Sequence, residues 1–234
     1  MKIVLIHGQN HKGSSYHIGR MFAEKIGTKD DISEFFLPGA LNHFCLGCYR
    51  CIENEENCPF YAQKRAIMEE VEKADILIFT TPTYCLHASA PMKAFMDLTF
   101  TYWMSHKPRR EMFEKRAIVV STAAGSGAKS AVKDISDMLF YWGVPVVKRY
   151  GIAVQAMNWE QVNPEKKRKI ERDVEKMADS LLKKKPKSGI KTKLMFSLMR
   201  MMQIKNWGAS PTEKEYWNEK GWLGKSRPWD SENE

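Results

Sequence analysis

Four of the five cysteines of this 234-residue chain fall within one stretch of 14 residues. They follow the pattern Cys-x2-Cys-x2-Cys-x6-Cys, formed by Cys45, Cys48, Cys51 and Cys58. Four thiolates at such a spacing can hold a [4Fe–4S] cluster or a tetrahedral zinc ion. Zinc sites more often pair two Cys-x2-Cys units across a longer gap, so the compact run favours iron and sulfur. The remaining interpretation is a loop of free or redox-active thiols.

A second candidate site is the segment His7-Gly8-Gln9-Asn10-His11-Lys12-Gly13-Ser14-Ser15, which follows an apolar run and precedes an amphipathic stretch. The start of a helix offers free backbone N–H groups and the positive end of the helix dipole, and both attract phosphate. Lys12 adds charge, and the serines add hydroxyl donors. The order of residues matches neither the Walker A pattern nor GxGxxG. From these residues alone, an ordinary capped loop explains the segment as well as a phosphate site does.

Two further loops end apolar runs. Pro82-Thr83-Tyr84-Cys85 follows residues 75–81, and Ala123-Ala124-Gly125-Ser126-Gly127 follows residues 116–122. Proline fixes the direction of the backbone, and small residues allow a planar ring to approach it. No arrangement of serine, histidine and carboxylate, or of cysteine and histidine, has a convincing catalytic spacing. We therefore expect no catalytic acid or base, as in enzymes whose chemistry belongs to a cofactor.

Apolar runs that alternate with amphipathic stretches must position these loops. The pattern predicts strands at 2–6, 32–37, 75–81, 116–122 and 144–154, and helices at 14–26, 62–74, 91–103, 129–142 and from 163 to about 185. Ser14 or Ser15 would cap the first helix, and Pro82 would stop the third strand. The alternation predicts an α/β fold, a doubly wound five-stranded parallel sheet of flavodoxin-like order 2-1-3-4-5. Ligands bind such sheets at the carboxyl ends of the strands.

The chain resembles the NAD(P)H-dependent FMN reductases, a flavodoxin-like family, over about residues 1–155. The resemblance lies in the strand–GxxxxGSS–helix segment, the cysteine motif, Pro82-Thr83-Tyr84 and the loop 123–127. It implies that FMN is bound with NAD(P)H as co-substrate, in a homodimer or homotetramer. The residues that would bind FMN are Gln9, His11, Lys12, Ser14, Ser15, Tyr16, Pro82, Thr83, Tyr84, Cys85, Ala123, Ala124, Gly125 and Gly127.

The function that the resemblance implies is an FMN-dependent oxidoreductase that passes electrons from NAD(P)H or a protein donor to a quinone or another small acceptor. The compact cysteine motif is also similar to that of iron–sulfur flavoproteins. In that alternative Cys45, Cys48, Cys51 and Cys58 hold a [4Fe–4S] cluster, and the protein transfers electrons without turning over a small molecule of its own.

The excess of positive charge lies late in the chain. Of the net charge of +9, all is accounted for by residues 164–207, which hold 14 Lys or Arg and 5 Asp or Glu. We divide the chain into an FMN-binding domain, 1–185, and a basic extension rich in Met and Trp, 186–234. Within it, Ile190–Met202 could form an amphipathic helix with Leu194, Leu198, Met201 and Met202 on one face. We expect this tail to pack on its own domain or on a second subunit, with its lysines in water. Residues 215–223 could form an aromatic cap over a flavin edge or a dimer seam.

The basic extension also allows an alternative of another class, a non-enzymatic module that binds nucleic acid or a membrane surface. We expect no nucleic-acid partner, because the helix from Asn163 to Lys185 has no aromatic residue to stack on bases. No apolar run approaches the roughly 20 residues that cross a bilayer, and the apolar start is too short for a signal peptide. We therefore expect a cytoplasmic protein whose cysteines form no disulfides.

Overall fold

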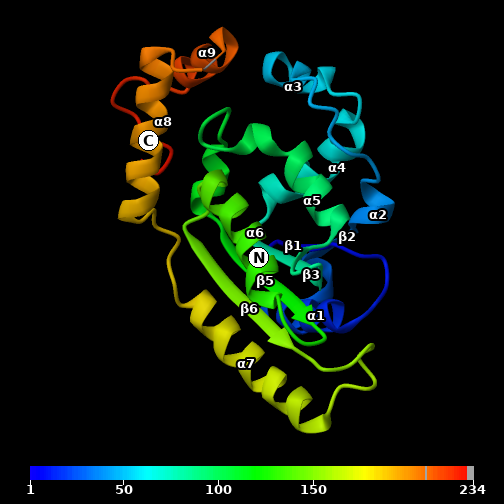
Figure 1. Ribbon diagram of the computed structural model, residues 1–234. Helices are drawn as coiled ribbons and strands as arrows, with labels where there is room; N and C mark the ends of the chain where they lie inside the picture. The colour runs from blue at the N-terminus through cyan, green and yellow to red at the C-terminus, as the bar shows by residue number, and fades with distance from the viewer. Residues whose placement is uncertain (209, 231–234) are drawn as a thin grey trace.

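A parallel sheet lies at the centre of the computed structural model, which describes residues 1–208 and 210–230 (Figure 1). Its strands run in the order β2-β1-β3-β5-β6, and the short β4 pairs antiparallel with the end of β3. Once this small hairpin is set aside, the order is the predicted flavodoxin-like one. The strands are β1 (Ile3–His7), β2 (Ile32–Phe36), β3 (Ile76–Tyr84), β4 (His87–Ala88), β5 (Arg116–Ala123) and β6 (Val146–Ala153).

Helices cover both faces of the sheet, as the alternating pattern predicts. Short 3-10 turns lie at 29–31, 55–57, 100–102 and 110–114. The α-helices are α1 (Ser14–Ile26), α2 (Leu37–Ala40), α3 (Arg50–Glu53), α4 (Tyr61–Lys73), α5 (Ala90–Leu98), α6 (Ala128–Trp142), α7 (Pro164–Leu182), α8 (Ile190–Lys205) and α9 (Pro211–Glu219). No helix among the described residues is long and apolar enough to cross a membrane.

Successive side chains of each strand point to opposite faces, so each strand supplies two cores. On one face Val4, Ile6 and Phe79 pack against α4, α5 and α6. On the other face Ile3, Leu5 and the neighbouring strands pack against α1 and α7. Because all these strand residues are buried, the runs are continuously apolar rather than alternating, which is typical of parallel sheets.

Three local predictions were wrong. The N-cap of α1 is Gly13 rather than a serine, and it makes no side-chain cap; Ser14 is the first helical residue. The strand β3 continues through Pro82 and ends at Tyr84. Pro82 is tolerated there because β1 pairs with β3 only as far as Thr80, so no strand on that side needs the backbone N–H that proline lacks. The helix predicted at 91–103 ends at Leu98, and a 3-10 turn follows.

The C-terminal helices form a third hydrophobic cluster beyond the sheet. Phe196 and Met199 of α8, with Trp217 and Trp222, pack against Met104 and Phe113. The face of α8 that packs is therefore not the predicted one, since Leu194, Leu198 and Met201 are exposed. The aromatic residues of the predicted cap at 215–223 belong to this cluster and pack on their own chain. The predicted boundary between residues 185 and 186 falls in the connection between α7 and α8, and residues 231–234 of the extension lie outside the described part.

Candidate functional site

The loop after β1 leads directly into the first turn of α1. Ser14 and Ser15 are buried in that turn, Tyr16 and Gln9 are half-buried, and His11 and Lys12 are exposed. Because Gly13 provides no side-chain cap, the first N–H groups of α1 have no partner from a cap. The Lys12 Nζ lies 5.5 Å from the centre of the Tyr16 ring. The loop thus combines open backbone donors with a nearby positive charge.

His7, the last residue of β1, anchors the start of this loop through its side-chain hydrogen bonds. Its Nε2 is hydrogen-bonded to Glu34 Oε1 at 2.8 Å, and its Nδ1 is hydrogen-bonded to the Thr80 hydroxyl at 2.7 Å. Burial acts to raise the pKa of Glu34, but the hydrogen bond with His7 and the charge of Arg20 hold it below its ordinary value. The ionised Glu34 therefore accepts from His7 Nε2 and fixes the orientation of the ring.

Ser89 ties this loop to the end of β3, and sequence reasoning did not find it. Its hydroxyl donates to the Gly8 carbonyl at 2.7 Å, and its backbone N–H donates to Thr81 Oγ1 at 3.0 Å. A Cβ on Gly8 would lie 2.6 Å from the Ser89 Oγ, so only glycine fits there. A serine beside a two-residue strand carries no signal in a single sequence, because its partners lie in a different loop.

The two loops predicted to line a flavin ring touch each other. Residues Cys85 and Leu86 form the turn of the β3–β4 hairpin, both with positive φ (48° and 68°). A Cβ on Gly127, whose φ is +92°, would lie 2.8 Å from Thr83 Cγ2 and 2.9 Å from Leu86 Cα. The hydroxyls of Thr83 and Ser121 are 2.9 Å apart and link β3 to β5.

The remaining predicted residues lie at the same edge of the sheet. Ala123 ends β5 and is buried, and its carbonyl accepts from the Val154 N–H at 2.9 Å; Ala124 holds Gln155 in the same way. Gly125 is exposed with no atom within 4 Å of a Cβ placed there. Tyr84 is 47% exposed. The fold therefore brings together the loops after β1, β3 and β5, as their place at the carboxyl ends of parallel strands requires.

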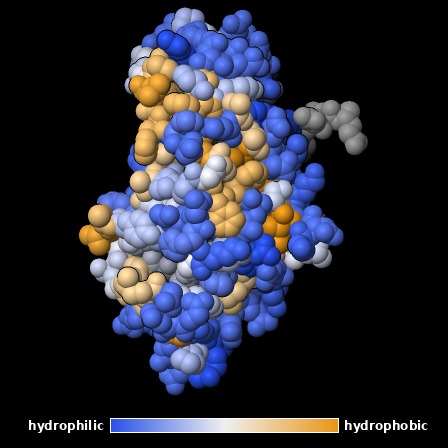
Figure 2. All heavy atoms as spheres, turned by 90° about the vertical axis from the view of Figure 1, so that its right-hand side faces the viewer, coloured by the Kyte–Doolittle hydropathy of each residue, from blue (hydrophilic) through white to orange (hydrophobic). Residues whose placement is uncertain are grey.

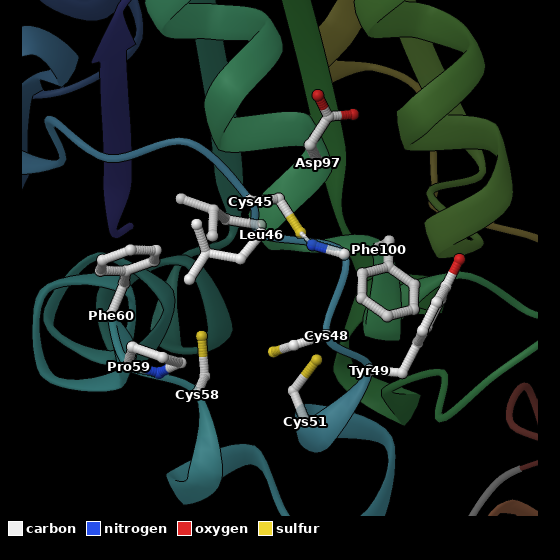
Figure 3. A pocket seen from close by; sticks show the side chains of 12 residues that line it. Cys45, Leu46, Cys48, Tyr49, Cys51, Cys58, Pro59, Phe60, Asp97 and Phe100 are labelled. Atoms are coloured by element: carbon white, nitrogen blue, oxygen red, sulfur yellow. Dashed lines mark hydrogen bonds between the residues drawn. The ribbon is translucent and has the colours of Figure 1, made fainter.

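The four clustered cysteines line one cavity of about 380 Å³, whereas Cys85 lies outside it. The sulfur atoms of Cys48, Cys51 and Cys58 point toward a common space, with Cys45 at its edge (Figure 3). The walls between them are mostly apolar and come from the cysteine loop, the start of α4 and the end of α5. No two of these cysteines form a disulfide. Burial raises the pKa of the Cys51 thiol above its ordinary value.

The size of this cavity bears on what it could hold. Among the described residues, no three His, Cys, Asp or Glu side chains converge closely enough to hold a single metal ion. A zinc ion would need its sulfur ligands at about 2.3 Å from one point. The thiolates of a [4Fe–4S] cluster bind different iron atoms and therefore stay farther apart. Four thiols that line one cavity are the kind of donor that such a cluster takes.

The cavity opens on a face with exposed hydrophobic side chains. Phe44, Leu46 and Tyr49 of the cysteine loop are 70%, 66% and 66% exposed. Figure 2 shows hydrophobic residues gathered on the side of the molecule that carries α2 and α4. Large exposed apolar groups beside a cavity are typical of a surface that meets another molecule.

Polar contacts hold the cysteine loop against residues 101–109. The Arg109 guanidinium donates to Glu55 Oε1 at 2.7 Å, and Thr101 donates to the same oxygen at 3.2 Å. The buried Lys107 Nζ donates to the Glu53 carbonyl at 3.3 Å. These residues come from the segment between α5 and β5, which in turn packs against the C-terminal helices.

Solved structures that resemble this fold include an FMN-dependent NADH-azoreductase from Bacillus anthracis in complex with FMN, with a TM-score of 0.57 and 13% identity over 77% of this chain and 99% of that one. The NAD(P)H:quinone oxidoreductase of Methanothermobacter marburgensis also has a TM-score of 0.57, with 17% identity over 75% of this chain and 94% of that one. At such identities the likeness establishes the α/β flavodoxin-like fold.

Two curated relatives carry the same description. An iron–sulfur flavoprotein of Archaeoglobus fulgidus is 27% identical over 227 residues, which are 95% of this chain and 100% of that protein. The iron–sulfur flavoprotein MJ1083 of Methanocaldococcus jannaschii is 27% identical over 108 residues, 44% of this chain and 52% of that protein. The profile of the NADPH-dependent FMN reductases matches residues 1–158, which include every loop described above. This chain is therefore an oxidoreductase that belongs to the NADPH-dependent FMN reductase family.

Proposed function

We propose that this protein binds FMN at the carboxyl edge of its sheet, holds a [4Fe–4S] cluster in the cysteine cavity, and transfers electrons between a reduced nicotinamide or protein donor and a quinone or other small acceptor. One observation carries the proposal: a single structural unit joins the loops that fit a flavin to a cavity lined by four thiols. The helix α5 starts beside Ser89 and ends at Leu98, which lines the cavity. Its nine residues span roughly 13 Å.

The residues at the edge of the sheet fit FMN by their chemistry. The uncapped first turn of α1, with Ser14, Ser15 and Lys12, offers the donors and the charge that a phosphate needs. Gln9, His11 and Tyr16 flank that loop. Pro82–Cys85 and Ala123–Gly127 would line the ring, and the close contact between Gly127 and Thr83 keeps these two loops in a fixed relation. Bound FMN supplies the hydride and single-electron chemistry.

In the proposed reaction, this chain's own residues position the flavin ring and its phosphate and tune the surroundings of the ring. Backbone groups of the loop after Pro82 can bond the polar edge of a ring, while the Thr83–Ser121 hydroxyl pair fixes that backbone to β5. The His7–Glu34–Thr80 network fixes the loop that would hold the phosphate. No side chain needs to act as an acid or base for electrons to move.

The cysteine cavity fits a cluster by the same kind of argument. Cys45, Cys48, Cys51 and Cys58 would be its ligands, and the apolar walls formed by Leu46, Phe60 and Phe100 would limit access of water. A cluster in this place supplies single-electron steps. The names of both curated relatives support this proposal. In this proposal residues 1–185 form the FMN-binding domain, and the protein acts as a cytoplasmic homodimer or homotetramer.

An anaerobic absorption spectrum of the protein as purified tests both cofactors. We expect flavin bands above a broad absorption that bleaches with dithionite, with about four iron and four sulfide per chain. The C48S and C51S variants should lose the broad absorption and the iron but keep the flavin. The matched control is C85S, because Cys85 lies outside the cavity, and it should keep the iron and the broad absorption. Flavin bands alone in the wild-type protein would contradict the cluster, and a spectrum unchanged by added FMN would contradict the flavin site.

The phosphate loop has its own test. The K12M variant should bind FMN about tenfold more weakly, because one charge contact to the phosphate is worth about 1.4 kcal/mol. Riboflavin, which lacks the phosphate, is the internal control and should bind both proteins equally.

A separate assay distinguishes the two modes of electron transfer. Rapid NAD(P)H oxidation with added FMN and a quinone supports the reductase, and its absence supports a protein that serves electron transfer alone.

A further inference from the structure

Lys64 is one of the largest fully buried side chains, with 1% of its surface exposed. Its Nζ has no hydrogen-bond partner. A buried ammonium without a partner loses its hydration and gains no interaction in return, which is unfavourable. Natural proteins rarely keep such a group unless something compensates for it.

The other buried lysines show what compensation looks like. Lys115 donates from its Nζ to the carbonyls of Glu72 and Ala74, at 2.7 and 2.5 Å. Lys107 donates to the carbonyl of Glu53 at 3.3 Å. Both are explained by the fold around them. Lys64 is not, so its partner is not a group that this chain provides among the residues described.

Its position points to the cysteine cavity. Lys64 lies in the first turn of α4, which begins three residues after Cys58. Its backbone N–H donates to the carbonyl of Phe60 at 3.1 Å, and Phe60 lines the cavity. A positive charge without a partner thus stands behind the wall of a cavity lined by four thiols.

We propose that Lys64 is a positioning residue for the metal cluster, and that its ammonium offsets the negative charge that four ligating thiolates bring into the apolar cavity. The inference rests on the proposed function, since it takes the cysteines as ligands. The four thiolates carry more negative charge than the iron–sulfide core neutralises, so the ligated cluster is an anion. Net charge near a cluster is one of the factors that set its reduction potential. A fixed positive charge favours the more negative, reduced form and therefore raises the potential.

The role predicts opposite effects on the two forms of the protein. Without the cluster, the buried charge of Lys64 destabilises the folded protein, so replacing Lys64 with an apolar side chain of similar length should stabilise it. With the cluster bound, the same replacement removes the compensating charge. A lysine that only filled space would instead give effects of the same sign in both forms.

The test compares K64M with wild type as full-length protein, with and without the reconstituted cluster. We expect K64M to lose its cluster to a chelator at least about tenfold faster, in line with changes to groups behind metal ligands. Its reduction potential, measured by anaerobic titration followed by EPR, should be more negative. Its melting temperature without cluster should be higher. K64R keeps the charge and should restore the potential.

The controls separate the possible failures. K115M also removes a buried lysine and should leave the potential of the cluster unchanged. A wild-type protein that takes up no iron would overturn the cluster and with it the role of Lys64. A wild-type protein that holds the cluster, with K64M equal to it in potential and retention, would overturn the role of Lys64 alone. Should K64M fail to fold, K64Q gives the same comparison with a neutral polar side chain.

Discussion

The Thr212 hydroxyl donates a hydrogen bond to Glu53 Oε2 at 2.6 Å, across 159 residues of sequence. Thr212 lies at the start of α9, and Glu53 ends α3, the short helix that carries Cys51. Figure 1 shows α9 and α3 on the same end of the molecule. The C-terminal extension therefore reaches the cysteine loop rather than the edge of the sheet that we propose to bind FMN. This contact gives the extension a structural role beside the proposed cluster.

We predict that T212V loosens the cysteine loop without changing global stability. A hydrogen bond of this kind contributes about 1 kcal/mol or less, because the bond is exposed to water. Amide hydrogen exchange should therefore accelerate in residues 50–57 by up to about fivefold, while the urea midpoint barely moves. The S197A variant is the matched control, since the Ser197 hydroxyl donates only to the carbonyl of Lys193 in its own helix. Equal exchange in both variants would mean that the contact does not support the loop.

Periodicity and turn residues predicted most of the sheet, because buried parallel strands are continuous apolar runs that end in Pro or Gly. They did not predict that β3 continues past Pro82, since that depends on where β1 stops pairing. They also gave the wrong face of α8. The lysines and leucines of that helix do not show which side meets the tryptophans of α9, because those partners lie later in the chain.

The loops and the cysteine motif could be proposed from the sequence because the chemistry of each is local in sequence. Ser89, Glu34 and Lys64 were not, because each acts through a partner or a burial that only the fold creates. Ser89 contacts Gly8 across 81 residues, and Lys64 reads as an ordinary surface lysine of a charged helix until its burial is known. Functional residues that serve through such contacts leave no pattern in one sequence.

Gly127 should be intolerant of any side chain. Its φ is +92°, and a Cβ would come within 2.9 Å of the backbone of Leu86. We predict that G127A lowers the free energy of unfolding by about 1–3 kcal/mol and weakens FMN binding, because the hairpin must move away. The measurements are urea unfolding and a fluorescence titration with FMN. G125A is the control for the stability measurement, since that site is open and its φ is not positive. A G127A protein as stable as G125A would show that the two loops do not depend on each other.

Lys115 should make stability rise with pH in the alkaline range. Burial lowers the pKa of its ammonium from 10.5 to about 8. Between these values the unfolded chain binds a proton that the folded chain has released, so raising the pH favours the folded form. We predict that, relative to K115M, the free energy of unfolding of wild type increases by up to about 1.4 kcal/mol per pH unit from pH 8 to 10. Below pH 8 the difference between the two proteins should be constant. Parallel curves across the alkaline range would contradict the lowered pKa.

Trp217 should hold the C-terminal extension on the rest of the protein. Its ring is fully buried at 4.8 Å from that of Phe196, and its Nε1 donates to the His106 carbonyl at 2.7 Å. Removing a buried Trp costs about 3–5 kcal/mol. Because α8 and α9 share their own hydrophobic cluster, we expect W217A to release the extension while the sheet stays folded. Trypsin should then cut within residues 183–193 about a hundredfold faster or more, since 1.4 kcal/mol corresponds to a factor of ten in the open population. FMN binding should persist, because no residue of its proposed site lies beyond residue 127.

W207A is the matched control, since Trp207 is 57% exposed and should leave the cleavage rate near that of wild type. If W217A is cut no faster than W207A, the extension is held by its polar contacts, such as His106 with Glu213, rather than by the tryptophan cluster.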